Sequence, residues 1–380
     1  MQDSAVQTST LQPSTVRTLP TVEDVARVAG VSRQTVSNVL NSPEIVKQTT
    51  TARVVAAIAQ LGYRPHASAR RLRTRKSSTI GVRLDPMTNG ISGSLLDRFL
   101  HALTEQAADR DLRIMLFTAR GFGGEIDAFS RLRDGADVDA FVLTSTVHND
   151  PRTAWLLDHD FPFVTFGRPS GVDDLNDPLH PWVDVDGFSG ARQATQHAIA
   201  CGARRVGYIG FDDESTTALE RRAGWASESA DQLGFGGTEL DALSLAVVDG
   251  VPQGNAAALR LLRLPDAPDA LVCASDSLAL GAMMAAASIG RTGLPVIGYD
   301  NTPVADAVGL SSVDQPLDLV AESALELLFG ESGSTIISRT HSATDPMHRL
   351  LTPTLVVRQS TQLARVEDSG SPVAGNHKES

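Results

Sequence analysis

Residues 21–41 read Thr21-Val-Glu-Asp-Val-Ala-Arg-Val-Ala-Gly-Val-Ser-Arg-Gln-Thr-Val-Ser-Asn-Val-Leu-Asn41, and this stretch predicts two short helices joined by a tight turn. Small apolar residues recur at i, i+3, i+4 and i+7 from Val22 to Ala29, which is the spacing of one helical face. Thr21 is placed to cap the first helix. Gly30 ends it, because glycine readily takes the left-handed conformation that a tight turn needs.

The second predicted helix begins after Ser32, which is placed as its N-cap. Its outward face is polar and consists of Arg33, Gln34, Ser37 and Asn38. Two small apolar faces that meet across a glycine turn form a helix-turn-helix unit, whose second helix is exposed enough to enter a DNA major groove. An ordinary helical hairpin fits the same pattern, so the charge of the surrounding chain must separate the two interpretations.

The charge of the chain is unevenly distributed. Residues 17–76 contain eleven basic and three acidic residues, whereas the whole chain carries a formal net charge of −12. A strongly cationic segment on an acidic body is typical of a DNA-binding arm attached to a part that does not bind phosphate. The charge therefore favours the helix-turn-helix interpretation.

The remaining sequence divides into further regions. Small apolar residues at helical spacing predict a third helix over 52–61, which would complete a helical head over 19–64. Residues 65–78 are basic and hydroxyl-rich and are expected to form a hinge or linker. The polar stretches 1–18 and 362–380 are expected to be disordered tails.

From residue 79 onward, short apolar runs alternate with longer amphipathic stretches. This alternation predicts an α/β body of parallel sheets flanked by helices, in which ligands lie beyond the carboxyl ends of the strands. Strands are expected at 80–84, 113–117, 140–143, 163–166, 206–209, 270–273 and 296–299. Helices are expected at 93–109, 124–133, 187–201, 218–233, 255–262 and 277–289.

Composition argues against several other classes. No stretch is apolar enough to span a bilayer, and the first twenty residues lack the apolar core of a secretory signal, so we expect a cytoplasmic protein with no membrane partner. Cys201 and Cys273 are the only cysteines and lie in no Cys/His cluster with metal-ligand spacing. We therefore expect no metal site and no cofactor.

Several motifs in fixed order carry a family resemblance. Thr-Val-x-Asp-Val-Ala, Ala-Gly-Val-Ser-x-x-Thr-Val-Ser, Leu-Gly-Tyr-x-Pro, Ala-x-x-Leu and Ser-Thr-Ile-Gly-Val follow one another over residues 21–82. In this respect the chain resembles the LacI/GalR family of bacterial transcription regulators. The resemblance continues through Phe166-Gly-Arg-Pro169, Val183-Asp-Val-Asp186, Arg221-Arg-Ala-Gly-Trp225, Ala274-Ser-Asp276, Ile297-Gly-Tyr-Asp300 and Leu351-Thr-Pro-Thr-Leu-Val-Val-Arg358.

The resemblance implies a body like that of periplasmic sugar-binding proteins, with two lobes, three crossovers and a ligand in the cleft between them. On this basis the effector-binding and dimerisation body is expected to span 79–361. One lobe is expected over 79–182 and 316–340, and the other over 183–315 and 341–361.

The resemblance also implies which residues contact DNA. Base edges would be contacted by Arg33, Gln34 and Asn38, although Asn38 stands where arginine or histidine is common in the family. Phosphates would be contacted by Thr21, Ser32, Thr35, Ser37 and Asn41. Ala69 and Leu72 fall on the family's hinge helix, whose leucine wedges into the minor groove, and we expect this hinge to be ordered only in a dimer on operator DNA.

Charged side chains at strand ends are candidates for binding a polar solute, because arginine and carboxylate groups each bind two neighbouring hydroxyls. By the resemblance, Arg221 and Asp276 align with the family's most reliable effector contacts, and Arg168, Asp186 and Gln315 with less reliable ones. An aromatic residue could stack on a sugar face, with Trp225, Phe188, Trp182 and Tyr299 as candidates.

Each of these assignments has a structural alternative. Asp186 and Asp276 could simply cap the helices that follow them, and Asp300 could fix the turn after its strand. Arg221 could form a salt bridge with Glu220 or Glu228. Trp225 could be part of the core.

The sequence as a whole predicts a DNA-binding repressor, acting as a homodimer or dimer of dimers, whose affinity for operator DNA is controlled by a small effector, most simply a sugar. A sugar-binding protein for transport would explain the body alone, but not the basic head. An enzyme is disfavoured because no GxSxG, P-loop, HExxH or clustered Cys/His motif occurs. A nonspecific nucleoid protein would not need a solute cleft.

Overall fold

The computed structural model describes residues 20–63, 76–85, 91, 93–169, 175–330, 333, 336 and 347–362. The chain forms two compact units, Met1–Lys76 and Ser77–Ser380, which we call the head and the body. Ala69 and Leu72, together with almost all of the expected tails, lie outside the described residues.

The head is all-helical and begins as its sequence predicts. Helix α1 (Val22–Ala29) starts with a capping box in which Thr21 and Asp24 each accept a hydrogen bond from the other's backbone N–H. Gly30 ends α1 in the left-handed conformation, with φ 63°. The Ser32 hydroxyl accepts the Thr35 N–H at the start of α2 (Arg33–Asn41). These local interactions explain why the two helices begin and end where they do.

The rest of the head closes around α1 and α2. A 3-10 turn, η1 (Pro43–Ile45), leads to α3 (Gln48–Leu61), which begins four residues before the expected start and has no side-chain cap from Lys47. Gly62 ends α3 with φ 61°. The core of the head consists of Val25, Ala26, Ala29, Val36, Val39, Val54, Ala57 and Tyr63.

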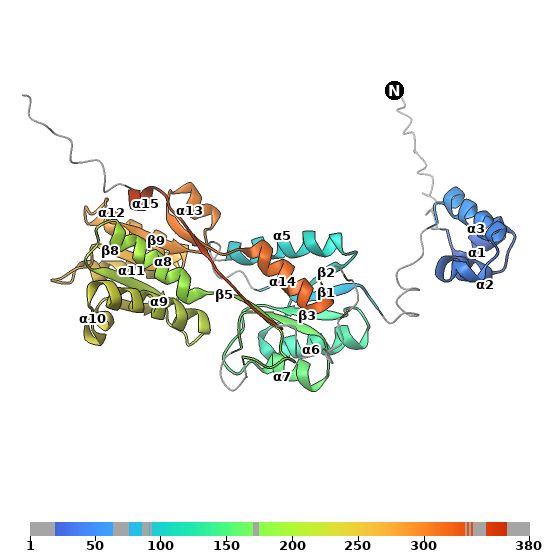
Figure 1. Ribbon diagram of the computed structural model, residues 1–380, viewed down its shortest axis with the longest axis horizontal. Coiled ribbons are helices and arrows are strands. Elements are labelled where there is room, and N and C mark those ends of the chain that lie inside the picture. The colour runs from blue at the N-terminus through green and yellow to red at the C-terminus, as the bar shows by residue number, and fades with distance from the viewer. Residues whose placement is uncertain are drawn as a thin grey trace, which may run out of the picture. The chain divides into compact units, whose positions relative to one another are not determined.

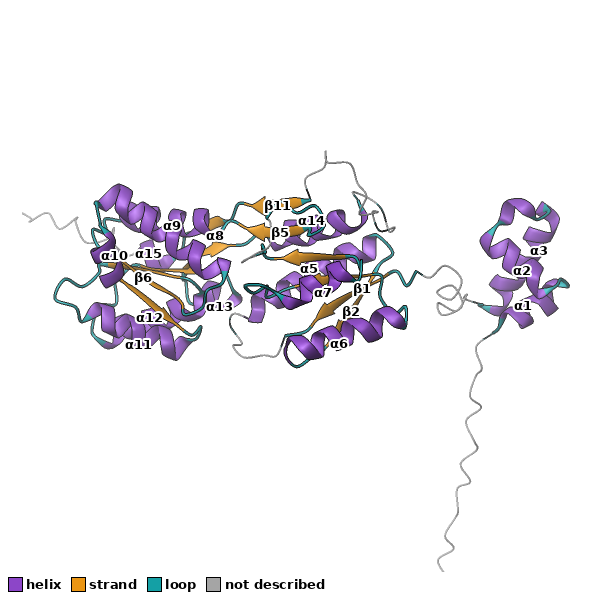
Figure 2. Cartoon of the chain, turned by 90° about the horizontal axis from the view of Figure 1, so that it is seen from below, coloured by secondary structure: helices purple, strands orange, loops and turns teal. Residues whose placement is uncertain are grey.

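The body contains two six-stranded sheets, each with helices on its faces (Figures 1 and 2). All strand pairs of the first sheet are parallel. In order across the sheet they are β11 (His348–Leu351), β5 (Trp182–Val185), β4 (Phe163–Phe166), β3 (Ala140–Leu143), β1 (Thr79–Arg83) and β2 (Arg113–Phe117). The helices of this lobe are α5 (Gly93–Asp109), α6 (Gly121–Asp134), α7 (Pro151–Asp158) and α14 (Leu317–Phe329).

The second sheet is parallel except for one antiparallel pair between β10 and β12. Its order is β12 (Thr354–Val356), β10 (Ser311–Asp314), β9 (Val296–Tyr299), β8 (Ala270–Cys273), β6 (Val206–Phe211) and β7 (Ser244–Val247). The helices of this lobe are α8 (Gly187–Ala200), α9 (Thr216–Leu233), α10 (Gly237–Ala242), α11 (Val251–Leu262), α12 (Asp276–Ser288), α13 (Pro303–Ala307) and α15 (Gln359–Gln362).

Strand pairing corrects the expected lobe boundaries. Strand β5 pairs with β4 and β11 in the first sheet, so the first crossover follows Val185 rather than residue 182. Strand β11 also belongs to the first sheet, although 341–361 was expected to lie wholly in the second lobe. The crossover between β10 and α14 falls at 315–316. Backbone pairing, which a single sequence does not reveal, decides these boundaries.

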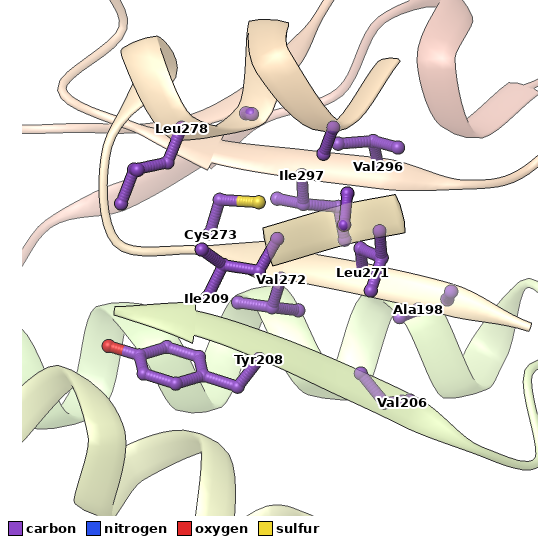
Figure 3. Packing of buried hydrophobic residues seen from close by; sticks show 14 of the residues in the cluster. Ala198, Val206, Tyr208, Ile209, Leu271, Val272, Cys273, Leu278, Val296 and Ile297 are labelled. Carbon is purple, nitrogen blue, oxygen red and sulfur yellow. The ribbon is translucent and has the colours of Figure 1, made fainter. Parts of the chain in front are cut away.

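Each lobe has its own apolar core. In the second lobe, Val206, Ile209, Leu271, Val272 and Ile297 pack between the central strands and their covering helices (Figure 3). Continuous apolar runs of this kind are typical of strands that are buried on both faces. In the first lobe, α5 and α14 cover one cluster, while α6 and α7 cover a second, aromatic-rich cluster.

Candidate functional site

The outward face of α2 presents the side chains that were expected to read bases. Arg33 and Gln34 are exposed and Asn38 is half-buried. The Gln34 side-chain amide donates to the Asn38 side-chain oxygen at 3.0 Å, and Arg33 pairs with Glu23 at 3.0 Å. Both interactions are solvent-exposed and weak, so DNA bases can replace them at little cost.

The residues expected to contact phosphate cluster mainly at helix starts. Thr21 caps α1, and Ser32 caps α2 with its hydroxyl 2.9 Å from that of Thr35. Ser37 is half-buried, and Asn41 is the last residue of α2. Backbone N–H groups at helix N-termini are suited to bind phosphate, and Thr21 and Ser32 stand at two such termini.

A cleft of about 1940 Å³ lies between the two lobes of the body. Its walls are formed by residues that follow the carboxyl ends of strands in both sheets, including Leu84 after β1, Thr144 after β3 and Val248 after β7. This is where parallel α/β sheets bind ligands. The volume exceeds the 300–1,000 Å³ typical of small-molecule pockets.

Three polar side chains meet at the wall of the cleft on the second lobe. Arg221 lies 3.4 Å from Asp300, and the Gln315 side-chain amide donates to the same carboxylate at 2.7 Å. Arg221 also donates to the Ala274 carbonyl at 2.5 Å and stacks on the Tyr299 ring, 3.6 Å from its centroid. Burial raises the pKa of Asp300, while Arg221 and Gln315 oppose that shift. This cluster offers preorganised donors and acceptors for hydroxyl groups.

Arg168 occupies a second polar cluster beside the same cleft. It donates to Asp184 at 2.9 Å and pairs with Glu220. Asp184 and Glu220 line the cleft, whereas Arg168 itself does not. Arg168 therefore acts on the cleft through the two carboxylates that it holds.

Besides Arg168, the expected effector residues Asp186, Asp276 and Trp225 do not line the cleft. Asp186 accepts the Ser189 N–H at 2.9 Å and caps α8, as its structural alternative proposed. Asp276 is buried and accepts from the Thr302 N–H at 2.7 Å and the Ser312 hydroxyl at 2.6 Å. It is not the cap of α12, a role taken by Ser275.

Trp225 was wrong as a stacking residue. It is fully buried, lies parallel to Tyr208 with ring centroids 5.3 Å apart, and donates its indole N–H to the Val206 carbonyl at 3.1 Å. The apolar face of α9 that packs on β6 places it in the core. Because the indole N–H of Trp225 is already bonded inside the protein, this side chain has no free polar group for a ligand.

Two aromatic residues that line the cleft were not predicted from the sequence. Phe166 is the last residue of β4 and Phe211 the last of β6, and both are half-buried. An aromatic residue at the carboxyl end of a predicted parallel strand was the available signal. Asp300 was considered, but Asp276 was preferred to it.

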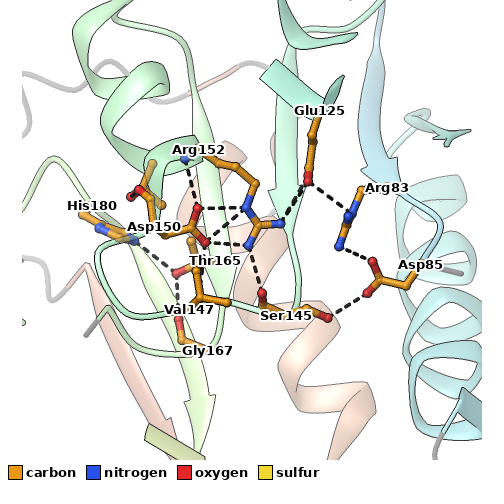
Figure 4. A network of polar contacts seen from close by, with 11 residues as sticks. Arg83, Asp85, Glu125, Ser145, Val147, Asp150, Arg152, Thr165, Gly167 and His180 are labelled. Carbon is orange, nitrogen blue, oxygen red and sulfur yellow. Dashed lines mark hydrogen bonds and ion pairs between the residues drawn. The ribbon is translucent and has the colours of Figure 1, made fainter. Parts of the chain in front are cut away.

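A buried ionic network supports the cleft wall on the first lobe (Figure 4). Arg152 is fully buried and contacts Asp150 at 2.6 Å and Glu125 at 3.2 Å. It also donates to the Ser145 carbonyl at 3.0 Å, and the Ser145 hydroxyl donates to Asp85 at 2.7 Å. Burial raises the pKa of Glu125, although Arg152 and Arg83 oppose the shift. The network fixes the loop after β3, which contributes Ser145 to the cleft.

The fold and these sites define a class of protein: a helix-turn-helix head joined to a two-lobed α/β body with a solute cleft. The family model for bacterial regulatory proteins of the lacI family matches residues 21–66, and that for a periplasmic binding protein-like domain matches residues 195–361. The transcriptional regulator CelR of Thermobifida fusca is 31% identical over 352 residues, covering 90% of this chain and 99% of the relative. AglR of Rhizobium meliloti is 33% identical over 75% of this chain and 76% of the relative.

This chain therefore belongs to the lacI family of bacterial regulatory proteins, which are DNA-binding transcription regulators. Both relatives are named as regulators and neither as an enzyme. None of the described helices has the length and apolar character required to cross a membrane.

Solved structures share the fold. A structure described as a CelR–cellobiose complex is 29% identical with a TM-score of 0.63, and covers 90% of this chain and 99% of the other. A lac repressor dimer bound to operator and an anti-inducer is 22% identical with a TM-score of 0.71, and covers 90% and 99%. The second likeness supports the architecture alone.

Proposed function

We propose that this chain is a cytoplasmic repressor that binds operator DNA as a homodimer or dimer of dimers, and that a sugar bound between its lobes changes its operator affinity. Family membership and the exposed polar face of α2 support the DNA-binding part. The lac repressor dimer on operator and the CelR–cellobiose complex are the family precedents for the dimer and the sugar.

The observation that carries the sugar proposal is the polar and aromatic lining of the cleft. Arg221, Asp300 and Gln315 present a preorganised donor–acceptor cluster, and Phe166 and Phe211 present aromatic rings. A sugar has both chemical characters, because its hydroxyls pair with charged groups while its C–H faces pack on aromatic rings. Asp276, Asp186 and Trp225 are not part of this proposed site.

On the DNA side, Arg33 and Gln34 would form the main base contacts, with Asn38 beside them. Arginine suits the guanine edge, and glutamine or asparagine the adenine edge. Thr21, Ser32, Thr35, Ser37 and Asn41 would position the head on phosphates. Ala69 and Leu72 are proposed as the minor-groove hinge, and this part of the proposal rests on the sequence alone.

The test measures operator binding by the purified protein across a panel of sugars at one stated salt concentration, with cellobiose as the first probe. We expect one sugar to change operator affinity. Asp300→Asn should remove that response and keep operator binding, whereas the exposed Asp306→Asn should behave as wild type. If no sugar of the panel changes the operator affinity of the wild-type protein, the proposal is contradicted.

A further inference from the structure

The charges that line the cleft restrict the class of effector. Resting on the proposed sugar-responsive function, we infer that the effector carries no anionic group: it is a neutral or amine-bearing sugar, and neither a sugar phosphate nor a sugar acid. Of the described residues that line the cleft, eight are aspartates or glutamates, and two, Arg120 and Arg221, are arginines. Residues 86–92, which separate Asp85 from Gly93 in the sequence, contain no lysine or arginine.

The buried cations at this site are already paired. Arg221 is 6% exposed and is shared between the Asp300 carboxylate and the Ala274 carbonyl. Arg168 binds both Asp184 and Glu220. Arginine recognises phosphate or carboxylate through two parallel N–H bonds. The bonding nitrogens of Arg168 and the Nη1 of Arg221 already have partners within the protein, whereas the buried Nε of Arg221 has none. An anionic ligand that took over Arg221 or Arg168 would draw the arginine away from Asp300, Asp184 or Glu220, and that carboxylate would lose its ion-pair partner.

A second group of acids at the cleft has no cation to neutralise it. Asp97, Asp213 and Glu214 are exposed and line the cleft, and none of them forms an ion pair with another described residue. Besides Arg221, Arg120 is the one arginine or lysine among the described residues that line the cleft, and it is also exposed. Because the ligand lies between low-dielectric walls, these charges are screened less than on an open surface.

Helix N-termini at the cleft could in principle attract an anion. On the second lobe three helices begin at the cleft, and two of them are already capped by side chains, α8 by Asp186 and α9 by Ser215. The third, α11, begins after Gly250 and follows Asp249, a further acid of the cleft lining. On the second lobe the local acids therefore offset the helix dipoles, and together with the unpaired acids they favour a neutral or positive solute.

Calorimetric titration of the full-length protein with sugar sets that differ only in charge tests the inference. The probes are glucose, glucosamine and glucose 6-phosphate, then galactose, galactosamine and galactose 6-phosphate, and finally cellobiose and cellobionate. In the set that binds, the neutral or amine member should bind at least about tenfold more tightly than the anionic one. An anionic member that binds equally or more tightly, and changes operator affinity, would overturn the inference while the sugar-responsive function stands. Binding by none of them, with a response to nucleobases instead, would overturn both.

A variant that removes one negative charge from the cleft tests whether the acids cause the preference for neutral sugars. Asp213→Asn keeps the oxygen that accepts the Ser215 N–H, and should narrow the neutral-to-anionic affinity ratio by about two- to fivefold. Asp212→Asn is the matched control, because Asp212 is exposed and adjacent but does not line the cleft, and its ratio should match wild type. A ratio unchanged in Asp213→Asn would show that the cleft acids do not select the ligand's charge.

Discussion

Arg98 of α5 donates to Asp314 at the end of β10 at 3.2 Å, and this ion pair joins the two lobes beside the cleft. Arg98 also donates to the carbonyls of Asp300 and Asn301, at 3.0 and 3.1 Å. Both of those residues have positive φ, 97° and 46°, a backbone conformation that is unfavourable for residues other than glycine. One first-lobe arginine thus holds the strained turn that carries the buried carboxylate of the second lobe.

Replacing Arg98 by alanine should loosen this turn and the contact between the lobes. The free energy of unfolding should fall by about 1 kcal/mol, because partly exposed hydrogen bonds are lost. The effector dose–response of operator binding should shift by about threefold or more. Arg110→Ala removes one bond within the first lobe, to the Gly330 carbonyl, and serves as the control for the dose–response. Equal dose–response curves for the two variants would argue against a link through Arg98.

The sequence predicted seven strands with continuous apolar runs almost to the residue, but it missed β5, β7, β10, β11 and β12. Strand β10 shows why. Ser311 and Ser312 look unsuited to a central strand, yet both are buried with hydrogen-bond partners far along the chain. Ser311 contacts Thr361, and Ser312 donates to Asp276. A buried polar strand of this kind is stabilised by tertiary partners, and local periodicity contains no information about them.

Asp276 and Asp300 could not be distinguished from the sequence for a related reason. Both follow buried strands at the same edge of one sheet, so a sequence pattern places both near the cleft. The structure separates them by their donors: Thr302 and Ser312 enclose Asp276, whereas Arg221 and Gln315 bind Asp300 at the cleft wall. Arg221 and Gln315, which the family resemblance also pointed to, both line the cleft.

Substitutions on α2 should separate base reading from phosphate binding. Arg33→Ala or Gln34→Ala should weaken binding to the specific operator by about 1–3 kcal/mol and relax the preference at one base pair. Gln60→Ala, exposed on α3, is the control and should leave both quantities unchanged. The affinity of each variant for an operator duplex and for a random duplex is measured by titration at the same salt concentration. Losses of the same size on both duplexes would reject base reading by α2.

Removing the arginine at the centre of the first-lobe ionic network should be costly. Arg152→Met leaves Asp150 buried without its ion-pair partner and Glu125 with Arg83 alone, so the free energy of unfolding should fall by about 3–5 kcal/mol. Urea unfolding measures this change, and Arg131→Met on α6 provides a control. A loss below about 1 kcal/mol would mean that the buried carboxylates find other partners or take up protons.

The pH dependence of stability should reveal the raised pKa of Asp276. Burial raises the pKa of Asp276 to about 7, nearby Asp300 adds to the shift, and the bonds from Ser312 and Thr302 oppose it. In the unfolded chain the carboxyl loses its proton near pH 3.9. Between about pH 4 and pH 7 the folded state therefore binds more protons than the unfolded state, and this residue's contribution to stability falls as the pH rises.

Asp276→Asn should remove that contribution, since an amide does not titrate in this range. The free energy of unfolding of wild type, measured relative to the variant by urea titration at pH 5, 6, 7 and 8, should decline with pH and level off above pH 7. The exposed Asp306→Asn should follow the wild-type curve. If the curves of wild type and Asp276→Asn run parallel over this range, then Asp276 is already ionised at pH 5, and the donors from Thr302 and Ser312 outweigh its burial.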